Sequence, residues 1–444
     1  MRVERPMKKD RKVWLIGLVA ALLLLAFAVM MYCEWRGSFS ETVYACRKML
    51  WAMPVFAVLI GLAHYSEAKD AGAKEYVKQV FCGKANSGGR KVYLDYARIL
   101  AAVMVILTHA CSMQVDEDAA PWRINLLLVC VGVGLVCNPL YVMLSGALLL
   151  GKEKEESLGK FYFRRFVKVA VPMLVYYVIF LCLSGGISLI PPQNIKEGAL
   201  LILAGASGIV PHYWLIYTLL SLYITAPFLR VMVRNLNDGQ ITALFYLILA
   251  QEVIATYCPL LGIQTGFIWN LAAWEGIFIL GYIITNRRTK LIERTVLILG
   301  GISVIILSAV MILDYTSKDY VCNKAPTMVL FAGAVLILLS KLEAKYKIKG
   351  KFDVLIQVLA KYSYAIILVH WCGLFVVTWG KIGLQPLRFG CIGGIALTVL
   401  VAFLVCFVLG FLADNTIVLV VQKGMEAIGK ISSGIKKSIG KKEN

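Results

Sequence analysis

The sequence is poor in charged residues and has no long polar stretch. Charged side chains make up 16% of its 444 residues, and apolar residues make up 60%. Soluble domains usually carry about a quarter charged residues. A soluble fold could not cover this much apolar surface, so lipid must contact much of it. The composition therefore excludes a chain of two or three soluble domains and predicts an integral membrane protein.

Patterns typical of metal sites, disulfide scaffolds and repeat proteins are also missing. The chain has 12 cysteines but no CxxC and no Cys/His cluster with zinc-like spacing. Most of these cysteines lie in apolar stretches, where cysteine behaves as a small apolar residue. No internal repeat at a fixed period is visible. We therefore expect neither a disulfide framework nor a bound metal.

Long apolar runs predict an all-α fold, a polytopic bundle of about twelve transmembrane helices, each of about 20 residues. The predicted spans are 13–33, 48–64, 93–113, 124–150, 166–187, 212–233, 241–259, 267–285, 293–313, 326–341, 361–380 and 388–412. The first run follows a basic start, like a signal peptide, but its length and the missing small-residue cleavage site favour a retained helix. The shorter apolar stretch 198–210 is expected to be re-entrant or interfacial.

Lys and Arg are distributed unevenly among the loops between these spans. If the N-terminus is cytoplasmic, most of the 46 basic residues fall in segments predicted to lie inside. The outer loop 114–123 is acidic, whereas the loop around Lys381 and Arg388 is a basic exception. This bias follows the positive-inside rule and predicts that both termini are cytoplasmic. Topology therefore accounts for most of the net charge of +20, and we expect no nucleic-acid partner.

Composition divides the chain into four parts. Residues 1–64 form a two-helix membrane extension, and residues 65–92, rich in Lys, Gly and Ala, form a cytoplasmic linker. Residues 93–412 form a ten-helix membrane domain. Residues 413–444 form a basic cytoplasmic tail, for which contact with anionic lipid is an alternative to a solvated tail.

Ionisable residues inside predicted spans are functional candidates, because charge is costly in a membrane. Arg98 and His109 are eleven residues apart, which is three helical turns, so both side chains point to one face about 16 Å apart along the axis. Asp95 is close enough to pair with Arg98. A cation near the cytoplasm and an imidazole deeper in the membrane suit one elongated ligand. The alternative is an arginine that reaches to the interface and an unrelated polar histidine.

Other polar residues are ambiguous when each is taken alone. Arg165 and Lys168 lie at the cytoplasmic mouth of a span, where they fit either a positive-inside loop or a site for a polyanion such as a nucleotide phosphate. Ser145 is a small residue near a helix end, where helices pack closely. His370 and Glu275 lie within predicted spans and are equally compatible with packed, hydrogen-bonded side chains.

Taken together, these segments resemble the acyltransferase 3 family of integral membrane O-acyltransferases, over about residues 90–412. The matching elements are Arg98 with His109 after Leu94-Asp95, Leu144-Ser145-Gly146, Arg165-x-x-Lys168 with Pro172, Trp214 with Tyr223 and Pro227, Gly281-Tyr282, and Ser363-Tyr364 with His370. The family has Arg where this chain has Lys168, a change that weakens a bidentate phosphate contact. The extension 1–64 lies outside the resemblance.

The resemblance implies acyl transfer, usually of acetyl, from cytoplasmic acetyl-CoA to a hydroxyl of a carbohydrate or cell-envelope acceptor. Arg98, Arg165 and Lys168 would then hold the CoA phosphates, and Asp95 would orient Arg98. His109 would be the general base. His370 would polarise the thioester carbonyl or orient the acceptor. Ser145 and Glu275 are expected to orient other groups.

The resemblance also implies a multi-pass protein of the cell (plasma) membrane. Many family members carry an extracytoplasmic hydrolase-like domain, whereas 32 residues follow the last predicted span here. We expect the chain to complete the transfer alone, to pass the acyl group to a separate extracytoplasmic transferase, or to act on a membrane-bound acceptor. The alternatives to an enzyme are a secondary transporter, disfavoured by the lack of an inverted repeat, and a non-catalytic sensor or export component.

Overall fold

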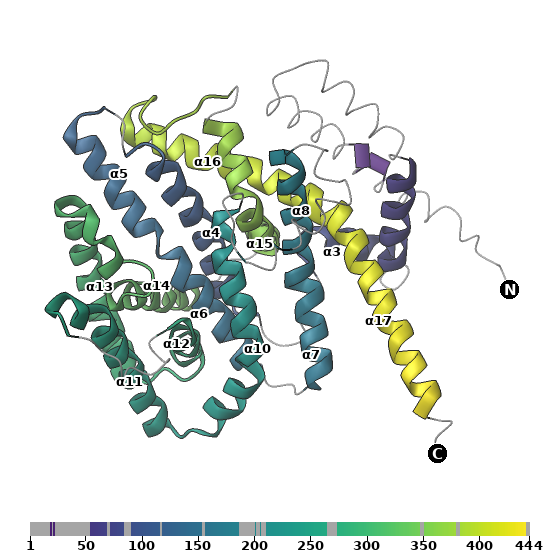
Figure 1. Ribbon diagram of the computed structural model, residues 1–444, viewed down its shortest axis with the longest axis horizontal. Helices are drawn as coiled ribbons and strands as arrows, with labels where there is room; N and C mark the ends of the chain where they lie inside the picture. Colours follow the sequence, from purple (N-terminus) through teal and green to yellow (C-terminus); the bar gives the residue numbers. More distant parts are fainter. Residues whose placement is uncertain are drawn as a thin grey trace. The chain divides into compact units, whose positions relative to one another are not determined.

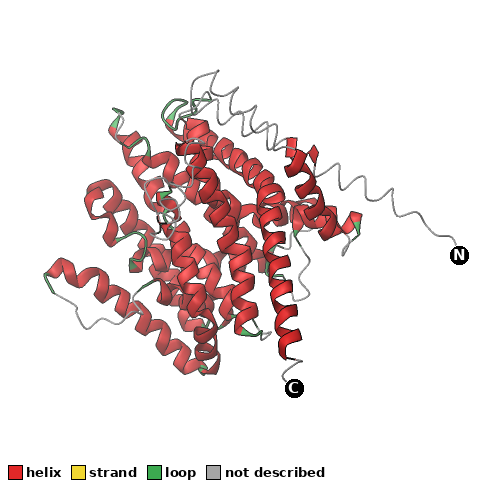
Figure 2. Ribbon diagram, turned by 45° about the vertical axis from the view of Figure 1, so that its right-hand side comes forward, coloured by secondary structure: helices red, strands yellow, loops and turns green. Residues whose placement is uncertain are grey.

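In the computed structural model, the described residues lie mainly in helices (Figure 2). It describes residues 18–19, 21–22, 54–68, 72–83, 90–115, 118–152, 156–185, 200, 205, 210–263, 273–346, 350–378 and 382–440. No strand occurs among these residues, which confirms the predicted all-α class for the described part of the chain.

The chain divides into two compact units, which are described one at a time. The first unit comprises residues 1–85, 159–214 and 408–444, and the second comprises residues 86–158 and 215–407. The labels used below are those of Figure 1.

The second unit contains most of the long apolar helices. They are α4 (Val92–Ser112), α5 (Pro121–Gly134), α6 (Cys137–Leu150), α10 (Trp214–Asn235), α11 (Asp238–Tyr257), α12 (Trp274–Asn286), α13 (Lys290–Leu313), α14 (Pro326–Lys345), α15 (Lys351–Thr378) and the part of α16 (Cys391–Ala413) that ends at residue 407. Among them α4 is central, because it packs against α5, α6, α14 and α15.

Eight helical segments among the described residues are long and apolar enough to cross a membrane. They are Val92–Ser112, Pro121–Leu150, Pro211–Asn235, Asp238–Leu261, Lys290–Leu313, Pro326–Lys345, Lys351–Thr378 and Cys391–Ile431. Each overlaps a predicted span, so the chain is a multi-pass membrane protein. The count of twelve spans and the cytoplasmic termini stay predictions. Nearly all of the predicted span 13–33 and of the stretch 198–210 lies outside the described residues.

Glycine allows a very close helix contact in the second unit, between α6 and α12. A Cβ atom at Gly146 would lie 1.8 Å from the carbonyl oxygen of Phe278, and one at Gly281 would lie 2.1 Å from that of Met143. No side chain fits at either position, so the two backbones touch. This contact explains two glycines of the motifs noted above and fixes α6, which carries Ser145, against α12.

The first unit joins the N-terminal extension to helices from later in the chain. Its elements are the helix 54–68, α3 (Ala73–Cys82), α7 (Leu158–Arg165), the π-helical turn η1 (Phe166–Ala170), α8 (Val171–Gly185), the 3-10 turn η3 (Pro211–Tyr213), the π-helical turn η6 (Asp414–Val418) and α17 (Leu419–Gly440). His64 contacts both Tyr76 of α3 and Asn415 of η6. Residues predicted as a linker and as a tail therefore include the helices α3 and α17.

Candidate functional site

The helix α4 presents the candidate residues, and its start is fixed by an acidic side chain from α14. Both carboxylate oxygens of Glu343 accept backbone hydrogen bonds, from the N–H groups of Val92 and Tyr93, each at 2.9 Å. Negative charge at a helix N-terminus satisfies unpaired N–H groups and complements the helix dipole. The small buried residues Ala97 and Ala101 let neighbouring helices approach α4 closely.

A chain of ion pairs connects the beginning of α4 to the beginning of α15. Asp95 accepts a hydrogen bond from Arg98 Nη1 at 2.6 Å and one from Arg90 Nε at 2.6 Å. Arg90 Nη1 in turn donates to Asp353 at 2.6 Å. Burial disfavours the charged form of Arg90, but its bonds to the two carboxylates raise its pKa above the usual value. The Asp95–Arg98 pair expected from the spacing is therefore present, within a larger network.

Three turns further along α4, the ring of His109 lies against two rings of α15. It stacks on His370 with ring centroids 5.1 Å apart and planes 23° apart, and it meets Trp371 edge-on at 5.3 Å. The structure thus brings together the two histidines that the sequence predicts as catalytic. No described residue hydrogen-bonds to a ring nitrogen of His109.

The ring of His370 is held in place by its own helix. It is 1% exposed, and its Nδ1 lies 2.6 Å from the carbonyl oxygen of Ile367. Because a carbonyl can only accept, Nδ1 is the donor, and in the neutral ring Nε2 is then the acceptor. A Cβ at Gly373, one turn beyond, would lie 2.3 Å from Cys406 Sγ. Close packing of α15 against α16 therefore fixes the backbone that carries His370.

The motif residues of α6 and α10 also meet. Ser145 Oγ lies 3.2 Å from the hydroxyl of Tyr223, and the hydroxyl of Tyr141 donates to the carbonyl oxygen of Arg98 at 3.5 Å. These bonds place Ser145 and Tyr223 in one polar pair and connect α6 to the level of Arg98 on α4. Ser145 thus takes part in a side-chain hydrogen bond as well as in close helix packing.

The predicted phosphate-binding residues Arg165 and Lys168 belong to the first unit, whereas Arg98 belongs to the second. Arg165 is half-buried and its guanidinium lies 5.4 Å from the ring centre of Phe161. Lys168 is exposed on the π-helical turn η1. Their predicted role as phosphate ligands stays a prediction.

Glu275 occupies a different position from the one expected. The sequence places it near the middle of the predicted span 267–285, but α12 begins at Trp274, and Glu275 lies in its first turn, half-buried. An acidic residue in the first turn stabilises a helix through its dipole. The apolar run obscured this start, because hydropathy alone does not mark where a helix begins.

Sequence reasoning missed residues whose partners are distant in the chain. Trp371 contacts His109, Arg90 and Asp353 extend the Asp95–Arg98 pair, and Glu343 caps α4. Trp371 follows His370 directly and could have been noted as its neighbour. Nothing local in the sequence identifies the partner of Glu343.

Comparison with known proteins identifies the family of the chain. The model of the acyltransferase domain matches residues 91–412. No curated protein and no solved structure matches the chain. The match covers most of the chain, so this protein belongs to the acyltransferase 3 family, and it is a membrane acyltransferase.

Proposed function

We propose that this acyltransferase moves an acetyl group from cytoplasmic acetyl-CoA to a hydroxyl of a carbohydrate or cell-envelope acceptor, with His109 as general base. The observation that supports this most is the setting of His109 within the membrane. Its ring stacks on His370 and meets Trp371 edge-on, while no described residue hydrogen-bonds to its nitrogens. An imidazole oriented in this way can accept a proton from a substrate.

In the proposed reaction His109 takes the proton from the acceptor hydroxyl while the oxygen attacks the thioester carbonyl. The new C–O bond forms, the C–S bond breaks, and the proton on His109 passes to the departing CoA sulfur. The products are an acetyl ester and CoA with a free thiol. Direct transfer of this kind needs no Ser or Cys nucleophile, although an acyl-histidine intermediate gives the same products.

His370 has two predicted roles, and its hydrogen bond favours one of them. With Nδ1 donating to the carbonyl of Ile367, the neutral ring presents an acceptor at Nε2. An acceptor cannot polarise a thioester carbonyl, but it can orient a hydroxyl. We therefore assign His370 to orientation of the acceptor.

Arg98 is proposed to bind a phosphate of the donor. Asp95 engages one of its nitrogens, and 32% of its side chain is exposed. A guanidinium has five N–H donors, so a carboxylate on one edge orients the group and leaves further donors for a phosphate.

The test is turnover of acetyl-CoA by the purified full chain, together with mass spectrometry of envelope glycans from cells with and without the protein. We expect release of CoA and loss of an acetyl mass from the glycans when the protein is absent. Transport of a solute without consumption of acetyl-CoA, or neither activity, would exclude the proposal. Location in the plasma membrane is checked by fractionation of the same cells.

A further inference from the structure

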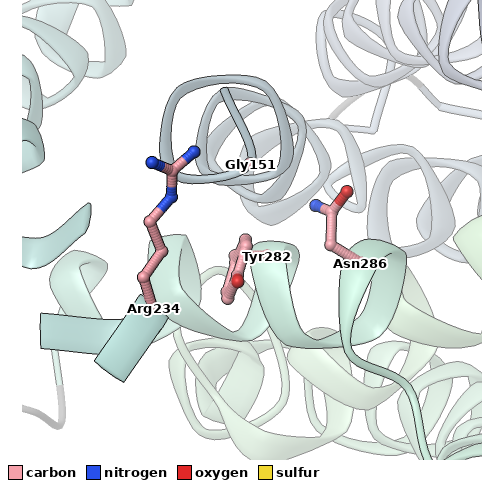
Figure 3. A pocket seen from close by; sticks show the side chains of 4 residues that line it. All are labelled: Gly151, Arg234, Tyr282 and Asn286. Atoms are coloured by element: carbon pink, nitrogen blue, oxygen red, sulfur yellow. The ribbon is translucent and has the colours of Figure 1, made fainter. Parts of the chain in front are cut away.

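A cavity of about 490 Å³ opens in the second unit, at the ends of three helices. It is lined by Gly151, which follows α6, by Arg234 in the last turn of α10, and by Tyr282 and Asn286 of α12. Figure 3 shows the side chains of Arg234 and Asn286 on either side of Tyr282, below the end of α6 at Gly151. The volume falls within the range of about 300–1,000 Å³ that is typical of small-molecule sites.

Close packing forms the walls of this cavity. A Cβ atom at Gly151 would lie 2.6 Å from the carbonyl oxygen of Ala147 and 2.9 Å from Asn286 Nδ2. Asn286 Nδ2 donates to that carbonyl of Ala147 at 3.2 Å, and Lys91 Nζ donates to Asn286 Oδ1 at 2.9 Å. The amide of Asn286 therefore joins the beginning of α4 to the ends of α6 and α12.

Arg234, which lines the cavity, and Lys91, which bonds to the lining residue Asn286, bring positive charge to it. Arg234 Nη2 donates to the carbonyl oxygen of Lys152, and within the described part of the chain no carboxylate pairs with Arg234 or Lys91. The contact with Lys152 ties α10 to the chain that follows α6, which is the simplest reason for an arginine at this position. This bond uses one of the five N–H donors, so the same guanidinium can hold a phosphate.

Positions along α4 give the axial spacing between Lys91, beside the cavity, and the groups of the candidate site. Lys91, bonded to the cavity residue Asn286, precedes Arg98 by seven residues, or about 10 Å, and His109 lies about 16 Å beyond Arg98. The order of groups along α4 is thus Lys91 beside the cavity, the guanidinium of Arg98, and the imidazole of His109. Acyl-CoA has a matching order, with an adenosine 3′-phosphate at one end, a pyrophosphate next, and the thioester at the end of a long arm.

We propose that the cavity lined by Gly151, Arg234, Tyr282 and Asn286 is a phosphate-binding subsite that takes the 3′-phosphorylated nucleotide of the acyl-CoA donor. The inference rests on the proposed function and adds the residues that bind the far end of the donor. Arg234 and Lys91 supply charge for the phosphate. Both N–H groups of Asn286 already donate, to Ala147 and Thr285, so its Oδ1 supplies an acceptor for the nucleoside, beside the hydroxyl of Tyr282.

The variant Arg234→Gln tests this subsite, because it keeps an amide donor for the carbonyl of Lys152 and removes the charge. In vesicles of phosphatidylcholine, we expect the KM for acetyl-CoA to rise about tenfold, the scale of one lost charge-assisted hydrogen bond, with kcat unchanged. For acetyl-pantetheine, which lacks the nucleotide and phosphates, we expect the same KM in variant and wild type. An unchanged KM for acetyl-CoA overturns the inference.

Two further variants guard against effects on folding. Arg388→Gln removes the same charge from an arginine that also donates to a backbone carbonyl, that of Gly383 at 2.9 Å, and it should leave the KM unchanged. Lys91→Gln changes an exposed side chain and should raise the KM for acetyl-CoA several-fold. If Arg234→Gln misfolds and so loses turnover of acetyl-pantetheine, the test rests on Lys91→Gln. An unchanged KM of Lys91→Gln for acetyl-CoA then overturns the inference.

A lipid headgroup is the other source of phosphate at a membrane surface. The measurements are therefore repeated in vesicles containing phosphatidylglycerol, where we expect the same ratio of the KM of Arg234→Gln to that of wild type for acetyl-CoA. If this ratio differs from one only in the vesicles with the anionic lipid, the cavity binds lipid and the nucleotide subsite is overturned.

Binding of CoA itself, measured as a rise in Tm, separates the two proposals. We expect stabilisation of wild type and a weaker effect on Arg234→Gln. A wild-type chain that neither turns over acetyl-CoA nor is stabilised by CoA overturns the proposed function and this subsite with it. If wild type turns over acetyl-CoA, and Arg234→Gln has the same KM and the same rise in Tm with CoA as wild type, the subsite alone is overturned.

Discussion

Two histidines in apolar helices, one in each unit, have very different surroundings. His64 is fully buried, with Nδ1 2.5 Å from the hydroxyl of Tyr76 and Nε2 2.8 Å from the carbonyl oxygen of Asn415. His109 is half-buried, and its described neighbours are the rings of His370 and Trp371. Both nitrogens of His64 are used to join three parts of the first unit, whereas those of His109 have no described hydrogen-bond partner.

The comparison teaches that the surroundings of a histidine, rather than its position in a helix, distinguish a structural role from a catalytic one. A ring whose nitrogens are both bonded to protein stabilises the fold. A ring fixed by stacking keeps its orientation while its nitrogens stay available for a substrate. Substitutions at the two sites should therefore have opposite signatures, in activity at one and in stability at the other.

The largest expected effect is the loss of activity in His109→Gln. Removing a general base lowers the rate by about 10²–10⁴-fold, whereas the absence of its ring stacking should change Tm little. The measurement is acetyl-CoA turnover alongside thermal unfolding. If His109→Gln turns over acetyl-CoA at the wild-type rate, His109 is not the general base and does not differ from His64 in its role.

His64→Ala should show the reverse pattern. It leaves the hydroxyl of Tyr76 and the carbonyl of Asn415 without their partner, and unsatisfied buried groups cost about 1–3 kcal/mol each. We expect a lower Tm and unchanged turnover per folded molecule. Lost turnover in folded protein would indicate that the first unit also takes part in the chemistry.

Arg98→Ala should raise the KM for acetyl-CoA by about tenfold, because one charged hydrogen bond is lost. The pH dependence of kcat should stay as in wild type, because it is set by His109. The matched variant Asp95→Asn keeps the shape of the carboxylate and removes its charge, so it should change KM less. If KM stays constant in Arg98→Ala, the guanidinium does not bind the donor.

The smallest effect is expected for Tyr76→Phe, which removes one partner of His64 and should cost about 1 kcal/mol. Burial raises the pKa of Tyr76 above its usual value of about 10. Since the folded state holds this proton more tightly than the unfolded state, the wild type should lose stability as the pH rises above about 10. Denaturation at pH 9 and pH 11 should show this loss in wild type and a smaller one in Tyr76→Phe.

Much of the fold could be predicted because membrane helices leave a local signal. The apolar runs located each of the eight candidate spans among the described residues, and the positions of Gly146 and Gly281 marked a close helix contact. The start of α12 at Trp274 was missed, since a continuous apolar run carries no boundary of its own.

The sequence by itself determined that the chain is an all-helical membrane acyltransferase, because long apolar runs and spaced motifs are local signals. It also determined that Arg98 and His109 share a face of α4, with Asp95 beside the arginine, because these relations depend on spacing within one helix. Only the tertiary structure decided which groups meet that face. His370 and Trp371 on His109, Asp353 at the end of the ion-pair chain, and the cavity beside Asn286 all come from distant segments. Packing between helices selects such partners, and no local periodicity records them.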